Sequence, residues 1–448
     1  DKMPAFGYRV LYLYTGETSE LNETPTDSPP LAGGNWIEND FYKVIINDNG
    51  SFNLIDKKAQ TTYPNLCSIE DVGDWGDEYD FSGPKATQKD TVIRSTNIMA
   101  KWNLRAGPIK ATADITYSLM IPHGLDEKNE RKQRLEESDP TQFRIYLELP
   151  ISRPIVQIKL EWNNESLDHR VQAIFPTNLK SNTVEADGHF YVIPRDVHRP
   201  KDDKWEQKWL PSHHQHKFVS VSNGTHSLTI INKGLPEYEA KVNKDQTISI
   251  GVTLLRSIGW LSRGDFASRS GNAGPHLYTP GAQCIGKQVC ELAVTTGQKS
   301  WLESGSYWVA EEFNTLLQPA VPMSINSQHR IIDGITFSMQ MGMKRVEYAT
   351  HNELPSTLSF LAIKNKMITI TAIKKAEKDN GLIIRVLNLA PTKQADNIRF
   401  YLPIKKAEIV NYNEETPKTP IKASVSAKEN TCTVELEPYV LGTIKIEF

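Results

Sequence analysis

The side chains best suited to chemistry lie in two stretches, and the first is Glu70–Pro84, with the sequence EDVGDWGDEYDFSGP. It holds six carboxylates interleaved with one tryptophan, one tyrosine and one phenylalanine. Carboxylates can bind the hydroxyls of a sugar, and an aromatic ring can pack on the apolar face of a pyranose. The stretch therefore suits carbohydrate recognition. It lacks the regular ligand spacing of a calcium loop, and an acidic surface loop without function is the alternative.

The second stretch is Thr253–Cys284, which beyond its first residues neither alternates like a strand nor repeats like a helix. We interpret it as a long ordered loop, and compact domains keep such loops mainly where a site needs them. A surface crossover between two sheets would give the same pattern. Five ionisable side chains are spread along it: Arg256, Arg263, Asp265, Arg269 and His276.

Three histidines in the sequence PSHHQHKF, at His213, His214 and His216, could suggest a metal site. Two adjacent histidines point in opposite directions on an extended chain. We therefore expect exposed loop residues here and no metal site at these three histidines.

The elements that must position these stretches have the periodicity of strands. Residues 40–55 place apolar residues on both sides of Asn49-Gly50, which is a strong hairpin signal. Short alternating or apolar runs that end at Pro, Gly or Asn predict further strands at 144–150, 155–162, 218–223, 227–232 and 247–255. The sequence thus predicts an all-β protein.

Three other regions complete this picture. Asp126–Ser138 is highly charged, and we expect a helical or disordered, solvated excursion between two strands. A new strand rhythm from about residue 357 predicts a compact antiparallel sandwich. Thr315–Leu354 has few strand signals and is the expected domain junction.

The start of the chain shows a strand without a nearby partner. Ala5–Leu13 has a strand pattern, but the polar linker Thr15–Pro30 follows it. Because a lone strand is only marginally stable, this strand either joins a distant sheet or completes a domain whose earlier strands precede the chain.

Composition limits the remaining choices. A chain of 448 residues suggests two or three domains. The formal charge of -3 is nearly balanced, which argues against nucleic acid or an anionic membrane as a partner. No apolar run approaches the roughly 20 residues that cross a bilayer. The cysteines lack a zinc or redox spacing, so we expect free thiols in the cytoplasm: Cys67, Cys284, Cys290 and Cys432.

Several blocks of the chain, in collinear order, resemble the carboxy-terminal β-rich half of glycoside hydrolase family 38, the α-mannosidases. The resemblance is closest to the bacterial branch, which includes mannosylglycerate hydrolases. The blocks cover residues 36–66, 70–82, 168–179, 234–240, 254–266, 271–284 and 372–391.

This resemblance implies an architecture in three parts. Residues 1–30 would be the last strand of a preceding small β domain with its linker. Residues 31–354 would form a large mutarotase-like super-β-sandwich, and residues 355–448 a small antiparallel β-sandwich. In the family, a zinc ion and an Asp nucleophile belong to an amino-terminal half, so the resemblance implies no catalytic or metal-binding residue in this chain.

The resemblance also implies substrate-binding residues. Tyr79 matches a family tyrosine that reaches the bound sugar, and Arg256 matches an arginine that faces the active site. An arginine suits such a place because it stays charged when partly buried and donates in pairs. Asp77, Arg263, Asp265 and His276 are further candidates.

Two functions from different classes follow. In the first, the chain is the carboxy-terminal part of a retaining, zinc-dependent α-mannosidase, with the amino-terminal catalytic half and a mannose-containing carbohydrate as partners. In the second, it is a free-standing carbohydrate-binding or scaffolding protein. A mutarotase acting alone would need a paired His and Glu, which we could not place. A bare β surface would be covered by the catalytic half or by a homo-oligomer.

Overall fold

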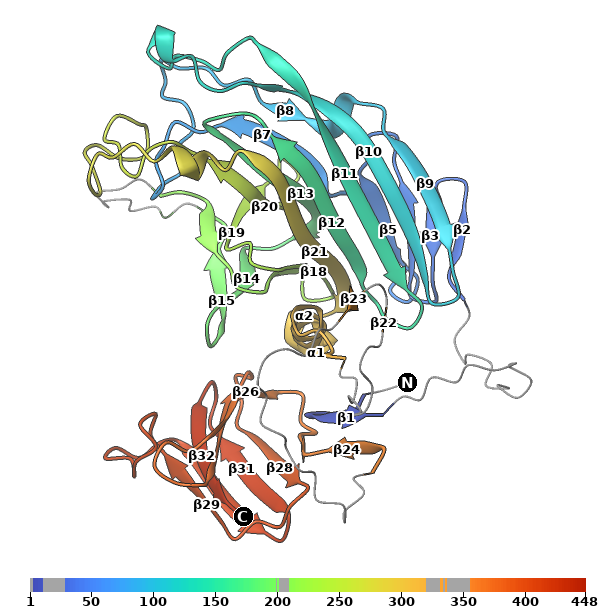
Figure 1. Ribbon diagram of the computed structural model, residues 1–448, viewed down its shortest axis with the longest axis vertical. Helices are drawn as coiled ribbons and strands as arrows, with labels where there is room; N and C mark the ends of the chain where they lie inside the picture. The colour runs from blue at the N-terminus through green and yellow to red at the C-terminus, as the bar shows by residue number, and fades with distance from the viewer. Residues whose placement is uncertain are drawn as a thin grey trace. The chain divides into compact units, whose positions relative to one another are not determined.

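The computed structural model describes residues 3–10, 29–198, 200, 209–319, 331–332, 335–336 and 355–448 (Figure 1). The chain divides into two compact units. The larger is Leu21–Asn314, and the smaller combines Asp1–Glu20 with Thr315–Phe448. Most of the predicted linker and of the predicted junction lies outside the described residues.

The larger unit is built, in its described part, on three antiparallel sheets. The sheet of nine strands has the order β15 (Val192–Asp196), β14 (Thr183–Asp187), β17 (Phe218–Ser222), β18 (His226–Asn232), β21 (Gly286–Gln298), β12 (Val156–Asn164), β11 (Ser138–Pro150), β10 (Lys110–Pro122) and β9 (Lys101–Ala106). Strands β10, β11, β12 and β21 form one curved layer (Figure 1).

The second sheet, of six strands, carries the candidate site. Its order is β16 (Ser212–His214), β19 (Glu237–Val242), β20 (Thr247–Ser257), β13 (His169–Lys180), β7 (Ser68–Gly73) and β8 (Ile93–Arg94). The third sheet comprises β2 (Leu31–Gly33), β3 (Trp36–Glu38), β4 (Tyr42–Ile46), β5 (Phe52–Asp56) and β6 (Thr61–Leu66). The hairpin predicted around Asn49-Gly50 is confirmed as β4 and β5.

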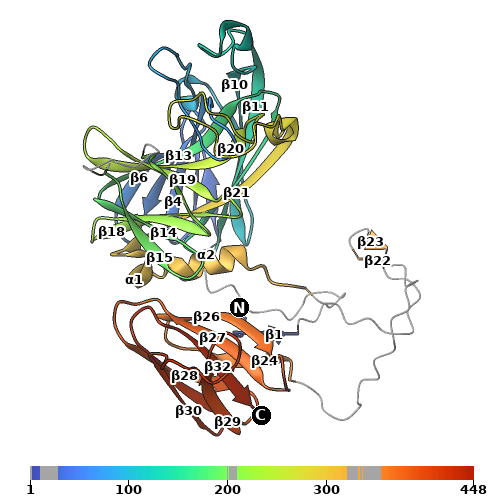
Figure 2. The same cartoon turned by 90° about the vertical axis from the view of Figure 1, so that its left-hand side faces the viewer.

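Short helical segments fill the connections of the larger unit. These are the 3-10 turns η1 (Ser95–Asn97), η2 (Glu127–Asn129) and η3 (Pro280–Gln283), and the α-helices α1 (Trp301–Ser304) and α2 (Ser306–Asn314). The two α-helices follow β21, and α2 packs against β18 and β21 (Figure 2). None of the helices in the described segments combines the length and apolarity that crossing a membrane would require.

Alternation along the strands explains the core of the larger unit. In β10, the side chains of Ala113, Ile115 and Tyr117 are buried, while those between them are partly exposed. One apolar cluster joins residues from all three sheets. Burying one face of each sheet against the others is the main stabilisation of such a sandwich.

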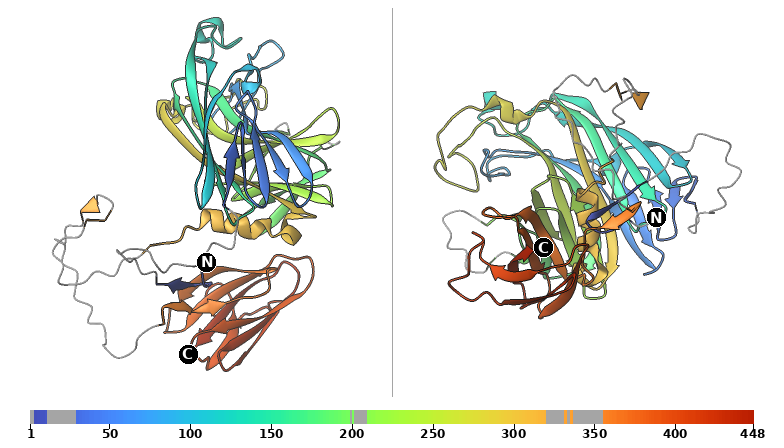
Figure 3. Two further views of the ribbon diagram at one scale, coloured as in Figure 1. Left: turned by 90° about the vertical axis from the view of Figure 1, so that its right-hand side faces the viewer. Right: turned by 60° about the horizontal axis from the view of Figure 1, so that its bottom comes forward.

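The smaller unit is an antiparallel sandwich of two four-stranded sheets. One has the order β25 (Leu361–Ala362), β28 (Gln394–Phe400), β31 (Thr431–Leu436) and β30 (Ala423–Lys428). The other has the order β26 (Ile368–Lys375), β27 (Leu382–Asn388), β32 (Leu441–Glu447) and β29 (Lys406–Val410). The strands of this sandwich are the orange and red arrows near the C-terminus in Figure 3. Both sheets contribute to one apolar cluster. The predicted all-β architecture, a large sandwich followed by a small one, is confirmed.

The strand without a nearby partner has a distant one. The chain pairs β1 (Gly7–Arg9) with β24 (Thr357–Ser359), so that Tyr8 lies opposite Leu358. A second two-stranded pair joins β22 (Ile331–Ile332) to β23 (Ile335–Thr336).

The charged stretch Asp126–Ser138 is only partly as expected. It does connect two strands, β10 and β11, and its regular part is the short turn η2. The expected solvation holds for most of the stretch and fails at two residues, because the side chains of Arg131 and Arg134 are buried. Arg134 forms an ion pair of 2.6 Å with Asp71, whose side chain is also buried. An ion pair of this kind cannot be predicted from local charge density.

Candidate functional site

Two loops meet at one end of the six-stranded sheet. We call residues 74–82 the acidic loop and residues 258–284 the long loop; they follow β7 and β20. Both strands pair with β13, and His169 lies opposite both Gly73 and Ser257. The two loops therefore leave the sheet side by side, although about 180 residues of sequence separate them. The predicted long ordered loop is confirmed from residue 258, whereas residues 253–257 belong to β20.

The end of β13 is fixed by a buried polar chain. His169 bonds through Nδ1 to Asp71 and through Nε2 to Asn164 Oδ1 at 2.9 Å. Asn164 Nδ2 donates to the Gln283 carbonyl oxygen at 3.2 Å. Since the amide nitrogen of Asn164 donates, its side-chain oxygen is the atom that accepts from Nε2 of His169. This series of hydrogen bonds ties η3, in the long loop, to the sheet.

The acidic loop is folded by two of its own carboxylates. Asp77 Oδ1 accepts from the backbone N–H groups of Tyr79 at 3.0 Å and Asp80 at 3.1 Å. Asp74 Oδ1 accepts from the N–H of Gly76 at 2.9 Å. A Cβ at Gly76 would lie 1.9 Å from the Asp80 carbonyl oxygen, so the turn requires glycine there.

Arg256 clamps the acidic loop to β20. Its Nε donates to Asp74 Oδ2 at 2.8 Å, and one terminal nitrogen donates to the carbonyl oxygens of Asp77 at 2.7 Å and Asp80 at 2.9 Å. Burial acts to lower the pKa of Arg256, but the charge and hydrogen bond of Asp74 outweigh it, and the pKa is raised. The guanidinium stays charged, and its donors are directed at the loop.

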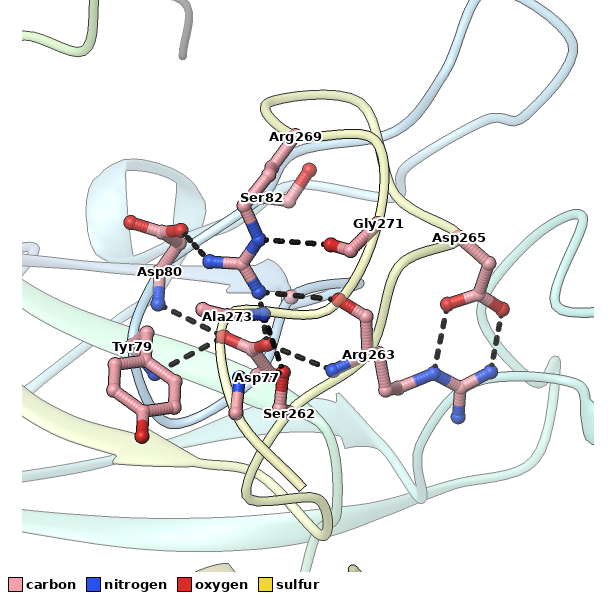
Figure 4. Close-up of polar contacts among 12 residues, drawn as sticks. Asp77, Tyr79, Asp80, Ser82, Ser262, Arg263, Asp265, Arg269, Gly271 and Ala273 are labelled. Carbon is pink, nitrogen blue, oxygen red and sulfur yellow. Dashed lines mark hydrogen bonds and ion pairs between the residues drawn. The ribbon is translucent and has the colours of Figure 1, made fainter. Parts of the chain in front are cut away.

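Arg269 closes the acidic loop from the other side. Its guanidinium forms ion pairs with Asp77 and Asp80 and donates to the Arg263 carbonyl oxygen at 3.1 Å (Figure 4). Asp77 Oδ2 also accepts from the Arg263 backbone N–H at 2.8 Å. The Asp77 side chain is fully buried and receives four donors. The Asp77 carboxylate is thus enclosed by groups of this chain, and its contact with a substrate stays a prediction.

Arg263 and Asp265 pair mainly with each other. Two hydrogen bonds of 2.9 and 2.7 Å join the guanidinium to the carboxylate. The hydrogen bond from Arg263 lowers the pKa of Asp265 to about 2, and burial opposes this only in part. The pair is therefore ionised at any physiological pH, and it braces the long loop next to Asp77.

Two predicted residues present rings at the surface. The Tyr79 side chain is exposed and extends away from the Arg269 ion pairs (Figure 4). His276 is exposed and stacks on Trp260 with ring centroids 4.5 Å apart and an interplanar angle of 11°. A Cβ at Gly274 would lie 2.8 Å from the Tyr79 hydroxyl, so the long loop touches this tyrosine closely. Exposed rings on rigid loops can offer flat apolar surfaces to a sugar.

The three histidines occupy a neighbouring edge of the sheet. Ser212–His214 form the edge strand β16, so the expected loop assignment is wrong for these residues. His214 and His216 are exposed and each stacks on His189. Among the residues that the structure describes, no group of three or more His, Cys, Asp or Glu side chains could hold a metal ion.

The sequence interpretation missed Asp74, Asp80 and Trp260 and left Arg269 out of the candidate set. One local signal was present, because Asp74, Asp77 and Asp80 recur every third residue around Gly76, a spacing that suits side-chain-capped turns. Their arginine partners lie about 180 to 190 residues away, and nothing in the sequence pairs them.

Comparison with known proteins gives these loops a context. Residues 37–262, half of the chain, match the family described as "Glycosyl hydrolases family 38 C-terminal domain". Residues 367–444 match "Glycosyl hydrolases family 38 C-terminal beta sandwich domain". The first match includes the acidic loop and the start of the long loop.

Individual relatives agree with this assignment. A protein of Halalkalibacterium halodurans named "Putative mannosylglycerate hydrolase" is 28% identical over an alignment of 432 residues that covers 92% of this chain and 42% of that protein. The crystal structure of an alpha-mannosidase from Enterococcus faecalis V583 superposes with a TM-score of 0.74 and 27% identity, covering 94% of this chain and 43% of the mannosidase.

A second crystal structure, of a protein in the glycosyl hydrolase family 38 from Enterococcus faecalis, has a TM-score of 0.73 and 26% identity, over 95% of this chain and 45% of that one. The chain thus spans less than half the length of these relatives. The match of half of the chain to one carboxy-terminal domain of the family, together with the match of residues 367–444 to the other, shows that this chain belongs to glycosyl hydrolase family 38.

Proposed function

We propose that this chain is the carboxy-terminal part of a retaining α-mannosidase that hydrolyses terminal α-mannosides. In this proposal the acidic loop and the long loop form the β wall of the substrate cleft. The bond is broken by groups in an amino-terminal half that the chain does not contain. The membership of family 38 and the length of the relatives support this division.

The observation that carries the proposal is the way Tyr79 is held. The loop beneath it is fixed by Arg256 on one side and Arg269 on the other, while the tyrosine ring is 55% exposed. Fixing a loop with buried ion pairs costs desolvation energy and does not by itself add stability. A rigid base under an exposed ring is the arrangement that ligand binding requires.

Two roles are assigned within this wall. Tyr79 and the His276 side chain contact the substrate, whereas Arg256, Asp77, Arg263 and Asp265 position the loops. The contacts support this assignment, because the charged group of each of these four side chains is hydrogen-bonded within this chain.

The resemblance to family 38 also implies a zinc ion, which some part of the enzyme must bind. The described residues of this chain provide no metal-binding group, so they do not fit the ion. We therefore assign zinc and the catalytic carboxylates to the amino-terminal half, and no step of catalysis to residues described here.

The proposal is tested by kinetics of the complete enzyme, in which this chain is joined to its amino-terminal half. Tyr79→Ala should lower kcat/KM for 4-nitrophenyl α-mannoside by about tenfold, which corresponds to about 1.4 kcal/mol. Tyr79→Phe keeps the ring and should lose less. Tyr401→Ala is the matched control, since Tyr401 lies in the small sandwich and is 51% exposed. Unchanged kinetics of Tyr79→Ala in a folded enzyme would remove Tyr79 from the site.

A further inference from the structure

A pocket of about 270 Å³ lies directly beside Tyr79. The acidic loop forms one wall through Tyr79, Asp80 and Phe81, and residues on and next to β16 and β19 form the other. Binding sites for small ligands typically measure roughly 300–1,000 Å³. The pocket therefore has room for one small unit, such as a three-carbon polyol or a single ring, next to a group bound at Tyr79.

Neighbouring strands fix the polar atoms of this pocket. In β16 and β19, His213 lies opposite Tyr238, and His214 lies opposite Glu237. The Thr253 hydroxyl, on β20, donates to Glu237 Oε1 at 2.6 Å. An arginine nitrogen of Arg170 also approaches Glu237 Oε1, at 3.7 Å. Both contacts use Oε1, and within the described part of the chain Oε2 of Glu237 is left for a ligand.

The described residues that line the pocket carry negative charge, and the arginines Arg170 and Arg195 lie near them. Among the residues that the structure describes, the lining of the pocket includes two carboxylates, Asp80 and Glu237, and no lysine or arginine. The cations behind the lining are shared, because Arg170 pairs with Glu239 as well as Glu237. In the same way, Asp80 shares Arg269 with Asp77. Each of the two carboxylates in the lining therefore pairs with an arginine that also pairs with a second acidic residue.

The histidine of the pocket does not offset this charge. Burial lowers the pKa of His213, and the positive charge of Arg195 lowers it further. His213 is therefore neutral near pH 7, and a neutral imidazole offers one N–H donor and one nitrogen acceptor. With the Ser212 hydroxyl and Glu237, it presents the mixture of donors and acceptors that hydroxyl groups require.

We propose that this pocket holds a neutral polyhydroxy unit joined to the sugar at Tyr79, and that it discriminates against an anionic unit through Glu237 and Asp80. The inference rests on the proposed function only in that Tyr79 faces the substrate. It adds that charge on the unit beside the mannose decides which α-mannosides bind well.

A matched pair of ligands tests this directly: α-mannosylglycerate and its neutral amide, which differ in one charge. Calorimetric titration of the purified chain at pH 7 should give tighter binding of the amide. One uncompensated charge at about 6 Å in largely hydrated surroundings changes affinity by about fivefold. Glu237→Gln should bring the ratio of the two affinities close to one, mainly by improving binding of the anion.

Two controls accompany the titration. Glu161→Gln removes a carboxylate from β12, in the nine-stranded sheet, and should leave the ratio unchanged. Raising the salt concentration should reduce the preference in the unmodified chain, because salt screens the repulsion. This second measurement needs no variant and so does not depend on the folding of Glu237→Gln.

The proposal is overturned if the anion binds as well as the amide, if neither ligand binds, or if Glu237→Gln leaves the ratio as it was. These outcomes are distinct from failure of the proposed function. A charge preference in the chain, combined with unchanged kinetics of Tyr79→Ala in the complete enzyme, would refute the contact of Tyr79 with the mannoside and leave the pocket as a binding site.

Discussion

Replacing Arg256 by methionine removes the clamp that holds the acidic loop on β20. The change deletes the ion pair with Asp74 and the hydrogen bonds to the carbonyl oxygens of Asp77 and Asp80. Asp74 is fully buried, so its carboxylate would stay in the interior without a cation. Breaking a buried pair in this way typically costs about 3–5 kcal/mol. We expect Arg256→Met to lower the free energy of unfolding of the larger unit by about that amount.

A double-mutant cycle isolates the pair. Asp74→Asn removes the charge and keeps an oxygen that can accept from the N–H groups of Gly76 and Ser82. We expect the double variant Asp74→Asn/Arg256→Met to be about 2 kcal/mol more stable than additive single effects would give, because no charge is left unpaired.

The assay is urea unfolding followed by tryptophan fluorescence. All nine tryptophans lie between residues 36 and 308, so the signal reports on the larger unit. Arg256→Lys is the control that retains the charge and loses the planar fork, and it should fall between the wild type and Arg256→Met. A loss below about 1 kcal/mol for Arg256→Met, or strict additivity in the cycle, would refute the clamp.

Two further predictions concern other parts of the larger unit. Gly274→Ala places a Cβ 2.8 Å from the Tyr79 hydroxyl, so in the complete enzyme it should raise KM for an aryl mannoside severalfold. Gly281→Ala lies on the same loop with open space around it and should leave KM unchanged. Equal KM values for the two variants would contradict the contact between Gly274 and Tyr79. Burial raises the pKa of Asp187 to about 7 from 3.8. The folded state therefore holds this proton to a higher pH than the unfolded chain does, and stability is lost as the pH rises through about 7. The Tm of Asp187→Asn relative to wild type should increase between pH 5 and pH 8, and a constant difference would contradict the burial of a carboxyl group there.

Much of the fold follows from local patterns. The hairpin at Asn49-Gly50, most strands of the small sandwich and the long loop after β20 were predictable, because alternation and turn residues act over a few positions. Polar strands were harder to find. In β30, the sequence ASVSAK has little apolar alternation, and its pairing with β31 decides its conformation.

The candidate site was predictable in its location and less so in its roles. The acidic and aromatic composition identified the loop of Tyr79. It could not show that Asp77 is buried under that loop, or that Arg269 pairs with it from 192 residues away. Burial and ion pairing depend on which strands lie together, here β7 and β20 on either side of β13. That arrangement is set by the whole sheet and is absent from any local stretch.

The central claim is that this chain supplies a substrate-binding wall while other groups break the bond. It is tested most directly by measuring release of 4-nitrophenol from 4-nitrophenyl α-mannoside, with the homogeneous chain alone and with the chain joined to its amino-terminal half. We predict no release above background from the chain alone and clear hydrolysis by the joined enzyme. Hydrolysis by the chain alone, in material free of any accompanying polypeptide, would contradict the account.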